Sequence, residues 1–143
     1  MPTAPPIHVG ALTIRFHVDA EQSDGSLTVF EVHVPARARV PAPHSHDGFE
    51  ETIFGLRGAT TWTVGGTETV IGAGESLCIR RGVVHGFVND SDDDATVLAI
   101  ASPGIFGPDY FREVGAVLAS AGGGPPDPDA VGDVMRRHGL TPA

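Results

Sequence analysis

The chain has 143 residues, 41% of them hydrophobic, and a formal net charge of −9. This length suits one folded domain with its own core, and the composition is that of a globular protein and not of a disordered one. The acidic balance argues against nucleic acid as a partner, because phosphate binding needs a basic surface. All nine basic residues are arginines, which excludes Schiff-base chemistry and a Walker-type phosphate loop, since both need a lysine.

The single cysteine, Cys78, excludes a disulfide within the chain and a cysteine-based zinc site. Its apolar neighbours Leu77 and Ile79 predict a buried thiol. The first ten residues show neither the basic nor the apolar segment of a secretory signal, and no apolar run approaches the ~18 residues of a membrane helix. We therefore expect a cytoplasmic protein with no membrane partner.

Turn residues interrupt the chain at short intervals up to Pro103, and the runs between them are rich in Val, Ile, Thr and Phe. This rhythm is typical of an antiparallel sandwich or barrel. The segment VGGTE predicts a tight hairpin, because consecutive glycines can adopt the positive φ angles of its turn. In chain order, the clearest predicted strands are residues 12–18, 26–34, 50–57, 60–64, 67–71, 76–79, 84–88 and 95–101.

The pattern changes to a helical one after the strands. A helix is predicted over 108–120, and one of its faces carries the apolar residues Phe111, Val114, Val117 and Leu118. A linker, AGGGPPDPD, leads to a second short helix over 129–138. The sequence thus predicts a β-barrel over 1–103 and a helical extension of the same domain over 104–143. We expect the first helix to pack on the outside of the barrel; the alternative is a lid or a dimer contact through Tyr110 or Phe111.

Two histidines, His44 and His46, alternate within the segment PHSHDGFEE. Alternate residues of a strand share a face, so both imidazoles can meet one metal ion. Glu50 or Glu51 can add a carboxylate, and the two point to opposite faces of a strand. His85, in RRGVVHGFVN, offers a further imidazole. This nitrogen and oxygen set predicts one divalent transition metal ion per chain: Fe, Mn, Ni, Cu or Zn.

These two stretches resemble the two sequence motifs of the cupin family. The first motif is matched by His44, His46, Glu51 and Gly58. The second is matched by Gly74, Gly82, His85 and Asn89. Both motifs are in register over residues 44–89, and two positions depart from the pattern: Val40 for an opening glycine and Arg80 for a proline.

The resemblance implies an all-β fold, a cupin jelly-roll β-barrel with one or two C-terminal α-helices packed outside. It also implies that the metal ion lies inside the mouth of the barrel, and it selects Glu51 over Glu50 as the carboxylate ligand. The implied ligand set is therefore His44, His46, Glu51 and His85. Small cupins commonly pair, so we expect a homodimer to which the C-terminal segment contributes.

Inward residues of the barrel would line a substrate pocket, for which the candidates are Phe49, Ile53, Trp62 and Phe87. Such a wall suits a flat, apolar or aromatic small-molecule substrate with an oxygen directed to the metal. Glu50 is the candidate for a catalytic base near the mouth of the barrel.

Three functions fit the resemblance. Small cupins of this kind are similar to quercetinases, which implies a metal-dependent dioxygenase acting on an aromatic or enolic small molecule. One alternative is a zinc-type Lewis-acid cyclase or isomerase of the polyketide-cyclase kind. The other is a non-catalytic cupin that binds a small molecule, although the sequence shows no helix-turn-helix that would report the binding.

Overall fold

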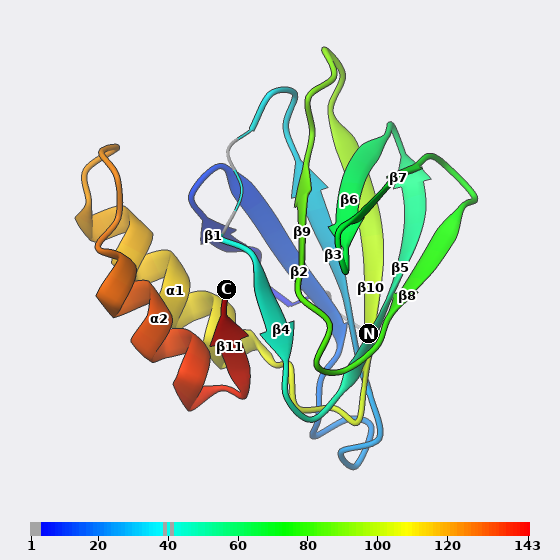
Figure 1. The fold of residues 1–143 in the computed structure, drawn as a ribbon. Coiled ribbons are helices and arrows are strands. Elements are labelled where there is room, and N and C mark those ends of the chain that lie inside the picture. The colour runs from blue at the N-terminus through cyan, green and yellow to red at the C-terminus, as the bar shows by residue number, and fades with distance from the viewer. Residues whose placement is uncertain (1–3, 39, 41) are drawn as a thin grey trace.

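The computed structural model describes residues 4–38, 40 and 42–143. Their strands form two sheets that face each other, and two helices lie together on one flank of the sheets (Figure 1). Neighbouring strands within each sheet are antiparallel. This is the double-sheet arrangement that a jelly roll requires.

The larger sheet has six strands, which follow one another across it as β1 (Ile7–Val9), β2 (Leu12–Val18), β3 (Thr28–Val34), β10 (Ala95–Ser102), β5 (Glu50–Arg57) and β8 (Ser76–Ile79). The smaller sheet has five, in the order β11 (Leu140–Pro142), β4 (His44–His46), β9 (His85–Val88), β6 (Thr60–Val64) and β7 (Thr67–Ile71). The helices are α1 (Pro108–Ser120) and α2 (Pro128–Arg137).

Alternating burial explains why the strand pattern could be predicted. In β3 and β10, which lie side by side, every second residue is buried. Side chains of a strand alternate between the two faces, so the apolar half of each strand covers the core between the sheets. All eight predicted strands and both helices are found, and the ends of each agree with the prediction within two residues.

The predicted VGGTE hairpin is confirmed. It connects β6 to β7, and Gly65 and Gly66 adopt positive φ angles of 56° and 83°. A two-residue turn with positive φ at both positions matches the right-handed twist of the strands it joins.

The prediction of a buried thiol at Cys78 was wrong, because this side chain is exposed. Cys78 lies opposite Thr52 where β8 pairs with β5, whereas the next residue, Ile79, is fully buried. Apolar neighbours on both sides of a strand residue belong to the opposite face, so they do not predict its burial.

The C-terminal segment packs against the flank of the sheets, with α1 in contact with β1 and α2 in contact with α1 and β11. An aromatic cluster anchors α1: the ring centroids of Phe30 and Phe111 lie 5.1 Å apart, and those of Phe106 and Phe111 lie 4.9 Å apart. The C-terminal segment contains a strand as well as the two helices: β11 joins the smaller sheet. Neither helix has the length and apolar character needed to cross a bilayer, within the part of the chain that the structure describes.

Candidate metal centre

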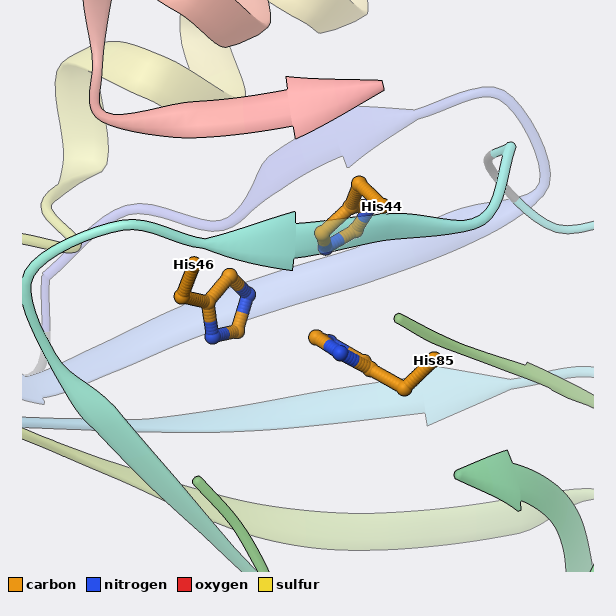
Figure 2. Close-up of side chains that lie close together, drawn as sticks. All are labelled: His44, His46 and His85. Atoms are coloured by element: carbon orange, nitrogen blue, oxygen red, sulfur yellow. The ribbon is translucent and has the colours of Figure 1, made fainter. Parts of the chain in front are cut away.

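Three histidines converge between the sheets. His44 and His46 lie on β4, and His85, the first residue of β9, lies directly opposite His44. Their possible ligand nitrogens all lie within 4.8 Å of one another. Figure 2 shows the three imidazoles with their nitrogens directed toward a common space. The structure thus brings together the three histidines that the sequence singled out.

The turn before β9 places His85. It closes with the backbone N–H of Val83 donating to the carbonyl of Arg80 at 3.2 Å, and Gly82 in between has a φ of 80°. This is the angle that a type II turn needs at its third residue, which explains the glycine. The N–H of Gly82 also donates to the carbonyl oxygen of His46 at 2.7 Å, so the same turn holds the facing strand.

Backbone carbonyls fix the tautomers of two histidines. Nδ1 of His44 lies 3.0 Å from the oxygen of Ala42, and Nδ1 of His85 lies 3.0 Å from the oxygen of Val83. A carbonyl oxygen only accepts hydrogen bonds, so each Nδ1 carries the proton and donates it. The lone pair is then on Nε2, and this is the usual arrangement of a metal-binding histidine and its supporting partner.

His46 has no such partner. Its side chain is fully buried, and neither ring nitrogen has a hydrogen bond within the described ranges, where no other buried side-chain nitrogen or oxygen lacks one. One face of its ring stacks on Phe49, with the centroids 4.3 Å apart. Unpaired polar atoms are rare in protein interiors because their burial is costly. A metal ion shared with His44 and His85 would bind the lone pair of one of these two nitrogens, so the residues fit a bound metal.

Burial keeps the three imidazoles neutral. It lowers the pKa of His46 to about 2, and the nearby His85 and His44 lower it further in the same direction. It also lowers the pKa of His44 to about 4, with a smaller effect from His85. Burial lowers the pKa of His85 as well. The neutral imidazole is the form that binds a metal ion.

Glu51 lies on β5 of the larger sheet and is buried, with its side chain at the same cavity as His44 and His85. Burial raises the pKa of its carboxyl to about 8. Among the described residues, the group of potential ligands that lie close together consists of the three histidines without Glu51. Its place as the fourth ligand stays a prediction.

Glu50 points away from this cavity. Its carboxylate accepts hydrogen bonds from Nε and Nη2 of Arg81 at 2.7 and 2.8 Å and from the Arg81 backbone N–H at 3.0 Å. These bonds lower the pKa of Glu50 to about 2. The side chain lines an open groove with Cys78 and Arg80, so this geometry gives no support to the predicted role as a catalytic base.

A cavity of about 60 Å³ lies beside the histidines. Three of the four predicted pocket residues line it: Ile53, Trp62 and Phe87. Trp62 stacks on Phe87 with the ring centroids 4.6 Å apart, and its indole N–H donates to the hydroxyl of Thr60 at 2.9 Å. Phe49 is not part of the lining and instead lies behind His46.

The sequence did not identify the wall that the C-terminal segment contributes. Phe106, Tyr110 and Phe111 all line the cavity, so the side chains that we considered for a lid or a dimer contact reach into the barrel. Tyr110 is 3% exposed. Burial, and to a lesser degree Glu51, raises its pKa, so the phenol stays protonated. The apolar helix face was visible in the sequence, but nothing there placed it against a cavity.

A comparison of the sequence with models of known protein families shows to which family the chain belongs. The model of the Cupin domain matches residues 30–101, which is half of the chain and includes both histidine motifs. The chain belongs to the cupin family. The jelly-roll fold class predicted for it is thereby confirmed, as is the helical flank. No curated protein is matched by its sequence.

Solved cupin structures share this fold. KdgF from Halomonas sp. has a TM-score of 0.62 and 19% identity, over 70% of this chain and 86% of that chain. The polyketide cyclase RemF from Streptomyces resistomycificus has a TM-score of 0.57 and 28% identity, over 64% of this chain and 65% of that one. A cupin protein from Bacteroides fragilis has a TM-score of 0.52 and 31% identity, over 55% of this chain and 66% of its own.

Proposed function

We propose that this cupin is an enzyme that depends on one divalent transition metal ion and acts on a small carbonyl or enolic molecule in the cavity. The observation that carries the proposal is the buried imidazole of His46, which lies beside His44 and His85 and whose nitrogens have no hydrogen-bond partner among the described residues. We assign these three side chains as metal ligands and propose Glu51 as the fourth.

The protein's own residues would do most of the substrate binding. A bound divalent ion would supply a Lewis acid that polarises a carbonyl or enolate oxygen. Trp62 and Phe87 form a flat apolar wall for the carbon skeleton, and the protonated hydroxyl of Tyr110 can donate a hydrogen bond to a second oxygen. The cavity of about 60 Å³ is smaller than the ~150 Å³ that holds a benzene molecule. An aromatic substrate would therefore require lining side chains to move.

Between reaction classes, the likeness to the polyketide cyclase RemF favours a non-redox cyclase or isomerase. The dioxygenase implied by the sequence resemblance stays a prediction, and it requires a redox-active metal, because zinc cannot transfer electrons to oxygen. A purely ligand-binding cupin is the third outcome. The homodimer and the cytoplasmic location also stay predictions.

The first experiment measures metal content by elemental analysis of protein purified without an affinity tag. We expect about one ion per chain in the wild type, as a single site implies, and loss of that ion in His46→Ala and His85→Ala. His17→Ala is the matched control, because His17 lies far from the triad in an exposed pair with Glu31. Circular dichroism verifies that each variant is folded.

The identity of the metal then directs the activity screen. Zinc leads to anaerobic assays of cyclisation and isomerisation, whereas iron, manganese, nickel or copper leads to measurements of oxygen uptake with enolic substrates. Full metal occupancy in both alanine variants would overturn the assignment of the site. Metal binding without turnover in either screen would support the ligand-binding alternative.

A further inference from the structure

The last strand of the chain pairs with the strand that carries two of the metal-binding histidines. In the register of β11 against β4, Leu140 lies opposite His46 and Pro142 lies opposite His44. Figure 2 shows β11, in pink, running beside β4. Leu140 is fully buried, so its side chain packs on the inner side of the sheet, where the imidazoles are.

Hydrogen bonds join β11 to both ends of β4. The backbone N–H of Asp47 donates to the carbonyl of Gly139 at 2.9 Å, and the N–H of Ala143 donates to the carbonyl of Pro43 at 3.1 Å. The hydroxyl of Thr141 donates to Oδ1 of Asp47 at 2.7 Å. These bonds reach from the residue before His44 to the residue after His46, so they enclose both.

The opposite edge of β4 has fewer attachments. Its pairing with β9 consists of one residue pair, His44 with His85, and the N–H of Gly82 binds the carbonyl of His46. A strand of three residues has little stability alone. Its pairing with β11, which extends over three residue pairs, is therefore the larger restraint on the backbone of β4.

We propose that β11 is a positioning element of the metal centre. By fixing the backbone of β4, it sets the directions in which His44 and His46 point, and Thr141 is the exposed side chain that contributes to this through Asp47. The inference rests on the proposed function, since it requires that the triad holds a metal ion. It gives the C-terminal segment a role at the site in addition to packing on the barrel.

Zinc affinity, measured by competition with a chromophoric chelator, and the visible spectrum of the cobalt-substituted protein test this role. Thr141→Val removes the hydroxyl and keeps the shape, and we expect zinc to bind roughly 3- to 10-fold more weakly, as one lost hydrogen bond allows. Its cobalt bands should shift. Thr141→Ser keeps the hydroxyl and should restore both readouts. A chain that ends at His138 lacks β11 and should lose roughly 10- to 100-fold in affinity.

Ser120→Ala is the matched control, because it removes a hydrogen bond to Val117 within α1 and does not touch β4. We expect its zinc affinity and cobalt spectrum to equal those of the wild type. If the shortened chain does not fold, Thr141→Val and Thr141→Ser test the positioning role without it. If Thr141→Val keeps the zinc affinity and cobalt spectrum of the wild type, the positioning role is overturned and the proposed function is not. Failure of the wild type to bind zinc or cobalt would overturn the proposed function and this inference with it.

Discussion

At the scale of single residues, the three histidines affect one another's protonation. The ring centroids of His46 and His85 lie 4.5 Å apart, and those of His44 and His85 lie 4.8 Å apart. A proton on one ring would place a positive charge beside the other two, in a setting from which water is largely excluded. A metal ion is a cation that all three neutral rings can share, so this cluster favours a metal over protons.

The adjacent residues Glu50 and Glu51 allow a matched test of the fourth ligand. Glu51→Gln keeps the shape of the buried side chain but removes its negative charge, so we expect zinc to bind roughly tenfold or more weakly. Glu50→Gln should leave zinc affinity unchanged, because that carboxylate is bound to Arg81 on the other face of the strand. Chelator competition measures both. Equal affinities in the two variants would mean that the histidines hold the ion without Glu51.

At the scale of elements, local patterns identified the strands of four or more residues, and the three-residue strands are absent from the predicted set. A long strand such as β10 alternates buried and half-buried residues over enough positions to be recognised. β11 has three residues, one of them a proline, and its partner β4 lies far away in the sequence. Such a pairing depends on where α1 and α2 place the end of the chain, and a local sequence pattern does not predict that position.

In the metal centre, too, local patterns predicted some features, and others depend on the tertiary structure. Strand parity predicted that His44 and His46 share a face, and the resemblance to the second cupin motif implied that His85 joins them, as the structure shows. The groups that orient two of these histidines are backbone carbonyls, which have no sequence signature. The contribution of Tyr110 to the cavity depends on the docking of α1, which is a tertiary feature.

The docking of α1 on β1 gives a prediction about Gly115. A Cβ atom added there would lie 2.4 Å from the carbonyl oxygen of His8, which is closer than real contacts allow. We expect Gly115→Ala to lower the free energy of unfolding by about 1–2 kcal/mol, because displacing the helix outweighs the better helix propensity of alanine. Urea denaturation measures this change.

Gly132 in α2 provides the comparison for this prediction. A Cβ atom added there meets only the end of the Arg136 side chain, at 3.2 Å, and that flexible side chain can move away. Gly132→Ala should therefore raise the free energy of unfolding by up to ~1 kcal/mol through helix propensity. Equal effects at the two glycines would show that α1 is not held tightly against β1.

At the scale of the whole molecule, distant parts of the chain meet at the metal centre. β4 comes from the first third of the sequence, β9 from the middle and β11 from its end, and all three lie side by side in the smaller sheet (Figure 1). The packing of α2 on α1 brings β11 back to this sheet. The contact between the two helices therefore supports both the stability of the fold and the site.

An acidic residue of α1 joins the two helices. Glu113 accepts hydrogen bonds from Nη2 of Arg137 at 3.1 Å and from the Nε2–H of His138. The bond from His138, followed by that from Arg137, holds the pKa of Glu113 below its ordinary value of 4.5. A carboxylate whose pKa is lowered by folding contributes stability above its unfolded pKa, and this contribution is lost as the pH falls through the folded pKa.

This linkage predicts how Glu113→Gln depends on pH. At pH 7 the variant should melt at a lower temperature than the wild type, and the difference should be small because the pair lies at the surface. As the pH falls below 4.5, the wild type gains a proton at Glu113 and the two melting temperatures should converge. Asp133→Asn is the control, since its partner Arg136 lies on the same helix and the pair does not join α1 to α2. Thermal melts at pH 7 and below 4 measure both variants, and a difference for Glu113→Gln that persists in acid would show that its charge does not hold the helices together.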